Sequence, residues 1–271
     1  MVDVKELVEA LHYIKKFRDH RFIVKFGGEI VLDERVLETI ALDLISLRDV
    51  GIHLVVIHGA GSQISSAMEG FGLKPDFVRG ERVTDREALD LVIGCLHYAN
   101  NKIVGMINRD AAVAVGLGGN LFKAERKKDL RHVGSVTSVN SEVVSDLIDG
   151  GYIPVVSPIG TDHEGNSLNI NADVAAGELA KAVGATKMIV LTNVEGVLDK
   201  GGNLIRKLDV SEARKLIVDE SVTGGMIPKL ESGIKALLEG GVECVHIIRA
   251  GEHAILGELL TEEGTGTMIT R

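Results

Sequence analysis

Two lysines, each close to a pair of glycines, are the residues of this chain best suited to chemistry. Lys25 belongs to the stretch FIVKFGG (22–28), and Lys229 to the stretch GGMIPK (224–229). Phosphoryl transfer needs fixed positive charge and bare backbone amides, because its catalysis consists mostly of positioning and charge neutralisation. Asp173, in NINAD (169–173), supplies a carboxylate that could order both ammonium groups. The pattern predicts a phosphoryl-transfer site formed by Lys25, Asp173 and Lys229.

Two glycine-containing turns follow two successive predicted strands. Gly27-Gly28 comes after the strand 22–26, and the turn HGAG (58–61) comes after the strand 54–57. Glycine lets backbone N–H groups approach an anion, and adjacent strand ends can share one ligand. Taken alone, the first turn fits a tight strand-to-helix connection equally well. We interpret His58 as structural rather than catalytic.

Other polar residues are candidates for substrate contacts. Arg82 could bind a carboxylate through two hydrogen bonds, although a surface arginine near a helix start explains it as well. Asn169 and Asn171 stand in an apolar neighbourhood and need partners, and Asn171 could also cap the helix that follows. Thr192 and Asn193 follow the predicted strand 188–191. Because ligands gather at the carboxyl edge of a parallel sheet, these two residues would face a nucleotide.

Short apolar runs alternate with helical patterns along most of the chain. Runs at 22–26, 54–57, 153–157, 188–191 and 244–248 are apolar enough for strands covered on both faces. Helical periodicities lie between them, as at 36–47, 175–183 and 228–240. This β-α-β-α order predicts an α/β protein, an αβα sandwich with a central, mostly parallel sheet.

The domain organisation is predicted to be one unit with two lobes. An amphipathic helix within residues 1–20 precedes the first strand, and could lie on its own core or make an oligomer contact. Residues 21–165 would form the amino-acid-substrate lobe and residues 166–271 the nucleotide lobe. In the middle of the chain, within the first of these lobes, we expect a hairpin at 131–140 and a loop at 116–119.

Bulk properties exclude several function classes. The net charge of −9 argues against nucleic acid or an anionic membrane surface as the main partner. Cys95 and Cys244 stand in apolar stretches, which favours core packing in a reducing compartment over a disulfide. No signal peptide, membrane-spanning stretch or metal-ligand spacing is recognised, so we expect a cytoplasmic enzyme with no protein-held metal.

Together these motifs resemble the amino acid kinase family, and most closely its members that phosphorylate N-acetyl-L-glutamate. The resemblance extends from about residue 22 to the carboxyl end. It includes the stretches KFGG (25–28), HGAG (58–61), GERVTD (80–85), NINAD (169–173), LTNVEG (191–196), GGMIPK (224–229) and GTGTM (264–268).

The resemblance implies transfer of the γ-phosphoryl group of ATP to the γ-carboxylate of N-acetyl-L-glutamate in arginine biosynthesis, with Mg²⁺ held mainly by the nucleotide phosphates. It assigns charge stabilisation to Lys25 and Lys229 and their ordering to Asp173. Backbone contacts near phosphate and substrate are assigned to Gly28, Ala60 and Gly61, and binding of the amino acid to Arg82 and Asn169. Binding of the nucleotide is assigned to Gly27, Thr192, Asn193, Gly225 and Met226.

The amino-terminal segment is similar to that of the arginine-inhibited, hexameric branch of the family. This similarity implies an L-arginine effector site at Tyr13, Glu258 and Gly264, and a homo-oligomer, either a dimer or a hexamer. Ala60, Glu81 and Asn193 depart from common family residues. Two other functions stay open: a kinase for carrier-protein-linked aminoadipate or glutamate, and a non-catalytic arginine-sensing partner of an acetyltransferase.

Overall fold

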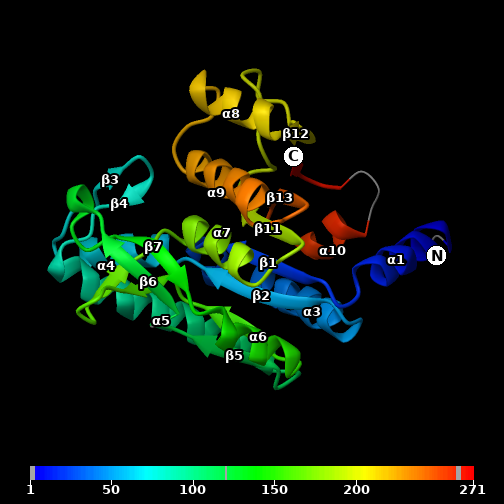
Figure 1. Ribbon diagram of the computed structural model, residues 1–271, viewed down its shortest axis with the longest axis horizontal. Coiled ribbons are helices and arrows are strands. Elements are labelled where there is room, and N and C mark those ends of the chain that lie inside the picture. The colour runs from blue at the N-terminus through cyan, green and yellow to red at the C-terminus, as the bar shows by residue number, and fades with distance from the viewer. Residues whose placement is uncertain (1–3, 120, 261–263) are drawn as a thin grey trace.

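The computed structural model describes residues 4–119, 121–260 and 264–271, in which helices and strands alternate (Figure 1). The first half contains α1 (Val4–Phe17), β1 (Arg21–Phe26), α2 (Gly28–Leu32), α3 (Glu34–Asp49), β2 (His53–His58), α4 (Gly61–Gly70), β3 (Phe77–Val78), β4 (Glu81–Arg82), α5 (Arg86–Asn108), β5 (Ala114–Leu117), β6 (Phe122–Arg126), the short 3₁₀ helix η1 (Lys128–Leu130) and β7 (Gly134–Val139). The second half contains α6 (Ser141–Asp149), β8 (Ile153–Val156), β9 (Ile159–Thr161), β10 (Ser167–Asn169), α7 (Ala172–Ala182), β11 (Lys187–Thr192), β12 (Lys207–Asp209), α8 (Val210–Val218), α9 (Met226–Glu239), β13 (Cys244–Arg249), α10 (Ala254–Leu259) and β14 (Thr267–Thr270).

A mostly parallel sheet forms the middle of the molecule. Within the described ranges its eight strands follow the order β12-β14-β13-β11-β1-β2-β8-β5. Neighbouring strands run parallel except β13 and β14. Lys25 on β1 lies opposite Ile57 of β2 and Val190 of β11. The predicted central sheet is confirmed, and the first strand of the chain lies in its interior.

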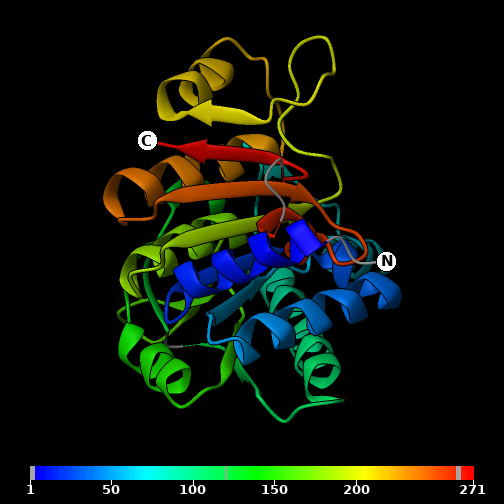
Figure 2. The same ribbon diagram turned by 90° about the vertical axis from the view of Figure 1, so that its right-hand side faces the viewer.

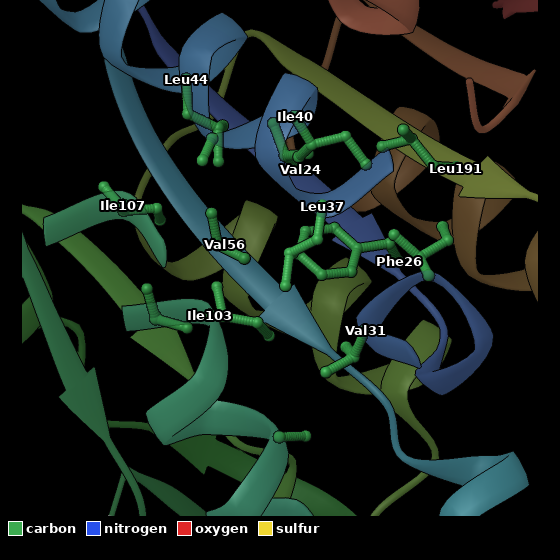
Figure 3. Close-up of a cluster of buried hydrophobic side chains, with 14 of the residues drawn as sticks. Val24, Phe26, Val31, Leu37, Ile40, Leu44, Val56, Ile103, Ile107 and Leu191 are labelled. Carbon is green, nitrogen blue, oxygen red and sulfur yellow. The ribbon is translucent and has the colours of Figure 1, made fainter. Parts of the chain in front are cut away.

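Helices cover both faces of this sheet (Figures 1 and 2). Helices α2 to α5 and α10 pack on one face, where α3 and α5 lie over β1 and β2 (Figure 3). Helices α6 to α9 pack on the opposite face around a second group of buried side chains. Val24 and Val56 contribute to the first core while Ile23 and Val55 contribute to the second, because successive strand residues point to opposite faces. The αβα sandwich is confirmed.

A smaller sheet and a hairpin lie beside the main sheet. Strands β10, β9, β6 and β7 form the smaller sheet, and β3 pairs with β4 in the hairpin. The predicted hairpin at 131–140 is wrong, since 134–139 is the single strand β7, which pairs antiparallel with β6. The predicted loop at 116–119 is wrong in part, because Gly116 and Leu117 end β5, paired parallel with β8.

The amino-terminal helix α1 packs against the core through its last turns. Residues 1–3 of the predicted helical segment lie outside the described residues. Phe17 is buried against the core of α3 and α5, and Tyr13 is half-buried beside it. Leu11, by contrast, is 57% exposed, so part of the apolar surface of α1 is uncovered. No helix in the ranges that the structure describes is long and apolar enough to cross a membrane.

Candidate active site

The two glycine turns meet at the carboxyl edge of β1 and β2. Phe26 lies opposite His58, and the amide of Gly59 donates to the carbonyl of Phe26 at 2.9 Å. A Cβ on Gly28 would lie 2.8 Å from the Cα of Ala60, so only glycine allows this approach. Helices α2 and α4 begin at these turns, and neither has a side chain bonded to its amino-terminal amides. These free backbone donors suit an anionic ligand.

Asp173 joins the two predicted catalytic lysines. Its Oδ1 lies 2.7 Å from Nζ of Lys25, and its Oδ2 lies 3.3 Å from Nζ of Lys229. Lys25 comes from β1, Asp173 from the first turn of α7, and Lys229 from the first turn of α9. Asn171 caps α7 by accepting from the amide of Asp173 at 2.8 Å, as predicted. Two cations and one carboxylate therefore occupy one buried cluster with a net positive charge.

The titration of this cluster follows from burial and charge. Burial alone would raise the pKa of Asp173, but the charges of Lys25 and Lys229 hold that pKa below its ordinary value. Burial lowers the pKa of Lys229, and the nearby charge of Lys25 lowers it further, while Asp173 opposes both effects. The carboxylate thus keeps a second ammonium group in a place that disfavours positive charge.

Arg82 is buried, and its close contacts within the described part of the chain are neutral groups. It is 8% exposed, and its guanidinium donates to Oγ of Ser65 at 2.7 Å and to the carbonyl of Gly61 at 3.0 Å. The remaining contacts are the Sδ of Met68 and the ring of Phe77. A buried cation among neutral groups attracts an anion. This geometry favours the carboxylate-binding interpretation over the surface arginine.

Asn169 is tied to Arg82 through Thr84. The side-chain amide of Asn169 donates to Oγ1 of Thr84 at 3.0 Å, and this hydroxyl donates to the carbonyl of Arg82 at 3.1 Å. The backbone amide of Asn169 also donates to the carbonyl of His132 at 2.9 Å. Sequence reasoning missed Thr84, a buried polar residue two positions after Arg82.

A cavity of ≈ 240 Å³ unites most of the predicted site. The predicted residues that line it are Lys25, Gly27, Gly28, Ala60, Gly61, Arg82, Asn169, Asp173 and Lys229. The other predicted nucleotide residues lie outside this lining. Thr192 is buried at the end of β11 beside the exposed Asn193, and the carbonyl of Gly225 accepts from Nζ of Lys229 at 3.1 Å. Met226 is the first residue of α9.

His58 supports the second turn from within the core. It is fully buried, and its Nε2 lies 3.1 Å from Nδ2 of Asn100 and 3.2 Å from Oγ of Ser157. Burial lowers the pKa of His58 to about 4, so its ring is neutral at pH 7. These contacts support the structural interpretation of His58.

A second cavity of ≈ 200 Å³ contains all three predicted effector residues. Tyr13 of α1, Glu258 of α10 and Gly264 line it together. Lys187 of β11 and His246 of β13 line it too, and sequence reasoning missed both. A lysine and a histidine within otherwise apolar strands are the signal that could have found them.

Glu258 is the centre of the polar contacts in this second cavity. Its Oε1 lies 2.7 Å from Nδ1 of His246, and its Oε2 accepts from the amide of Gly266 at 3.0 Å. The hydrogen bond from His246 holds the pKa of Glu258 below its ordinary value although burial opposes this. Nζ of Lys187 lies 4.6 Å from the centre of the Phe17 ring of α1. The cavity therefore connects α1 with α10 and the main sheet.

Among the described residues, no group of three or more histidine, cysteine, aspartate or glutamate side chains is placed to hold a metal ion. Asp173, the buried carboxylate of the candidate active site, is bound to the two lysines instead.

Comparison with known proteins identifies the family. Residues 20–248 match the sequence model of the amino acid kinase family. This chain belongs to the amino acid kinase family. It is 46% identical to the acetylglutamate kinase of Methanocaldococcus jannaschii over 286 residues, which cover 98% of this chain and 95% of that protein. It is 44% identical to the acetylglutamate kinase of Archaeoglobus fulgidus over 289 residues, or 99% of each chain.

Two solved structures have the same fold. N-acetylglutamate synthase from Neisseria gonorrhoeae, complexed with coenzyme A and L-arginine, superposes with a TM-score of 0.90 at 26% identity, over 100% of this chain and 66% of that longer chain. Carbamate kinase from Giardia lamblia, bound to AMP-PNP, superposes with a TM-score of 0.70 at 16% identity, over 93% of this chain and 98% of that one. The second likeness concerns the fold alone.

Proposed function

We propose that this protein is an acetylglutamate kinase, which transfers the γ-phosphoryl group of ATP to the γ-carboxylate of N-acetyl-L-glutamate in arginine biosynthesis. The observation that carries the proposal is the bridge from Asp173 to Lys25 and Lys229, opposite the two glycine turns of one cavity. It occurs in a chain that is 42–46% identical to acetylglutamate kinases over 98% or more of its length.

The chemistry requires no general base. A γ-carboxylate is ionised at pH 7 and attacks phosphorus through one of its own oxygens, while the bond from phosphorus to the bridging oxygen of ADP breaks. Lys25 and Lys229 would stabilise the charge of the transferring group from two sides. The amides of Gly28, Ala60 and Gly61 would bind its oxygens. The product is an acyl phosphate, N-acetyl-L-glutamyl 5-phosphate.

Substrate orientation follows from the distribution of charge in the cavity. The lysines suit the reacting γ-carboxylate and the phosphates, so the buried guanidinium of Arg82 is available for the α-carboxylate. Asn169 would hold the amide group of the substrate near Arg82. Residues 21–165 then supply the amino-acid lobe, and residues 166–271 the nucleotide lobe.

Thr192, Asn193, Gly225 and Met226 of the nucleotide lobe would contact ATP, together with Gly27 of the amino-acid lobe. The two glycine turns, 27–28 and 58–61, suit a phosphate tail because they leave backbone amides uncovered. A Cβ on Gly28 would collide with the Oε1 of Gln63, 2.1 Å away, and with Ala60. Mg²⁺ would be held mainly by the nucleotide phosphates, whose charge it would screen when bound.

We also infer that L-arginine regulates the enzyme through the second cavity. Glu258 offers a carboxylate for a guanidinium, and Tyr13 and Gly264 line the same space. The arginine complex of the Neisseria gonorrhoeae synthase, 26% identical to this chain, supports an effector site in this fold. The exposed Leu11 on α1 supports a homo-oligomer, either a dimer or a hexamer. We place the enzyme in the cytoplasm.

A hydroxylamine trap tests the catalytic proposal directly. The purified protein is incubated with ATP, Mg²⁺ and N-acetyl-L-glutamate, and hydroxylamine converts any acyl phosphate to a coloured hydroxamate. We expect hydroxamate in proportion to ADP, and its loss in Lys25→Ala. A folded wild-type protein that yields hydroxamate only from a carrier-linked substrate would be the carrier-linked kinase, and one that yields none from any amino-acid substrate would favour the non-catalytic arginine sensor.

A further inference from the structure

An ion pair between Glu81 and Lys127 stands at the edge of the catalytic cavity. Nζ of Lys127 lies 2.8 Å from Oε1 and 2.7 Å from Oε2 of Glu81, so it contacts both carboxylate oxygens. The two side chains are 18% and 29% exposed, respectively. Glu81 belongs to β4, and Lys127 immediately precedes η1. The pair therefore joins the β3–β4 hairpin to the connection between β6 and β7.

Backbone contacts hold the lysine in place. The amide of Lys127 donates to the carbonyl of Val133 at 2.8 Å, and its own carbonyl accepts from the amide of Leu130 at 3.1 Å. Val133 in turn pairs with Asn169, which is bonded to Thr84 beside Arg82. The ion pair thus belongs to the same connected structure that positions Arg82.

Glu81 separates the catalytic cavity from a groove on the outside. It lines the cavity that contains Lys25 and Arg82, and it also lines a groove formed by Val78, Arg79, Glu81, Lys127, Lys128, Asp129 and Leu130. Glu81 therefore faces both spaces, and its partner Lys127 lines the groove.

The position of the N-acyl group follows from covalent chemistry. In an N-acyl glutamate, the α-carboxylate and the acylamino group are attached to the same carbon. With the α-carboxylate on Arg82 and the γ-carboxylate near Lys25, the acyl chain must extend from the Arg82 end of the cavity. Glu81 adjoins Arg82 in sequence, and Val133 and Asn169 line this end with it.

We propose that the Glu81–Lys127 pair closes the acyl end of the substrate cavity and restricts the enzyme to free amino acids with a short N-acyl group. This inference rests on the proposed kinase function and names its substrate class. A longer acyl chain, or a peptide linkage to a carrier protein, would have to pass through the space of the paired side chains. The pairing also matters for charge, since Lys127 neutralises a carboxylate that would otherwise repel a dianionic substrate.

An acyl-length series tests the steric part. The substrates are N-acetyl-, N-propionyl-, N-butyryl- and N-hexanoyl-L-glutamate, and the hydroxamate assay gives kcat/KM for each. For the wild type we expect a fall of about 100-fold or more from acetyl to hexanoyl, in the range by which a closed apolar pocket discriminates. In Glu81→Ala/Lys127→Ala this fall should shrink to about 10-fold or less. Equal kcat/KM of the wild type for N-acetyl- and N-hexanoyl-L-glutamate would overturn the proposal. So would a dependence of kcat/KM on acyl length that is unchanged in the folded double variant.

A matched control and a charge test complete the experiment. Lys181→Ala/Glu239→Ala removes an exposed ion pair between α7 and α9, and should keep the wild-type profile.

Lys127→Met leaves the carboxylate of Glu81 unpaired and should raise KM for N-acetyl-L-glutamate about 10-fold with little change in kcat. Adding Glu81→Gln should restore KM, and a KM that is unchanged in Lys127→Met, or is not restored, would contradict the charge role.

These results are separable from the kinase assignment. Turnover of N-acetyl-L-glutamate by the wild type decides whether the protein is this kinase. The dependence on acyl length then decides whether the Glu81–Lys127 pair closes the cavity, whatever the absolute rate.

Discussion

Replacing Asp173 by asparagine is the sharpest perturbation of the lysine cluster. The carboxylate contacts Lys25 at 2.7 Å and Lys229 at 3.3 Å, and both ion pairs are largely buried. At an effective dielectric constant of 20, two unit charges about 4 Å apart attract by about 4 kcal/mol. The amide oxygen of asparagine would retain about 1 kcal/mol of this as a hydrogen bond. Lys229 therefore loses about 3 kcal/mol of preference for its charged form.

This loss converts to a pH shift of known sign. The pKa of Lys229, which burial and the charge of Lys25 have already lowered, should therefore fall further when Asp173 no longer opposes both effects. A lysine acts as a charge stabiliser only when protonated, and its protonated fraction decreases once the pH exceeds its pKa. In Asp173→Asn the alkaline limb of the kcat profile should therefore move to lower pH.

The assay is the pH dependence of kcat between pH 6 and pH 10 at saturating ATP, Mg²⁺ and N-acetyl-L-glutamate. We expect kcat of Asp173→Asn at pH 8 to be about 100-fold lower than in the wild type, with partial recovery toward pH 6. Asp149→Asn, which removes a carboxylate that pairs with Arg21 far from the cavity, serves as the control. An alkaline limb at the wild-type position in a folded Asp173→Asn variant would refute the charge-ordering role of Asp173.

Four further predictions concern other parts of the structure. Arg82→Ala should raise KM for N-acetyl-L-glutamate about 100-fold with little change in kcat, because it removes the buried partner of the α-carboxylate; steady-state kinetics with unaltered KM would contradict this. Gly28→Ala should lower kcat about 100-fold or more at nearly unchanged KM for ATP, because its Cβ would separate the turn from Ala60, and wild-type turnover would exclude the close approach. Glu258→Gln should abolish inhibition by L-arginine without changing the uninhibited rate, which a titration of activity with L-arginine will check. The pKa of His58 is about 4 in the folded protein, below the ordinary value of 6.5, so the unfolded chain binds the proton first and the free energy of unfolding falls as the pH drops from about 6.5 to 4. This group accounts for about 3 kcal/mol of that fall. Urea unfolding at pH 7 and pH 4.5 should therefore show a smaller loss of stability at low pH in His58→Asn than in the wild type.

The interior strands were predictable from sequence because their environment is uniform. The segments of β1, β2 and β11 are buried on both faces, and such strands require nearly continuous apolar runs. Lys25 interrupts one of these runs, and an ammonium group in that setting needs a reason. The two glycine turns follow directly from the ends of β1 and β2. Sequence order therefore predicted the side of the cavity that these strands form.

The small sheet was less predictable because β6 and β7 are half-exposed and because β6 also pairs with β9, which is distant in sequence. Strand β7 pairs with the preceding strand β6 across a basic connection, so the alternation within residues 131–140 did not reveal its partner. Gly116 suggested a loop, yet it lies in β5. It is a glycine because a Cβ there would be 2.2 Å from Oδ1 of Asn100. A glycine required by a neighbouring helix cannot be told from a turn glycine in one sequence.

The effector cavity shows the same limit. Tyr13, Glu258 and Gly264 were named through family resemblance, whereas Lys187 and His246 were missed. Their segments read as ordinary apolar strands, and the polar side chains gain meaning only when β11 and β13 lie beside each other. The role of a buried polar residue depends on pairing that composition does not contain.

The interior position of β1 has a consequence for how the cluster around Asp173 can fail. Lys25 lies on a strand bonded to neighbours on both sides, whereas Lys229 follows a short exposed segment at 223–225. Amide hydrogens of β1 should exchange with deuterium only when the whole molecule unfolds, while those near 224 should exchange through local opening. Heat should therefore disable the kinase before it melts the protein, and brief warming should be followed by full recovery of turnover on cooling.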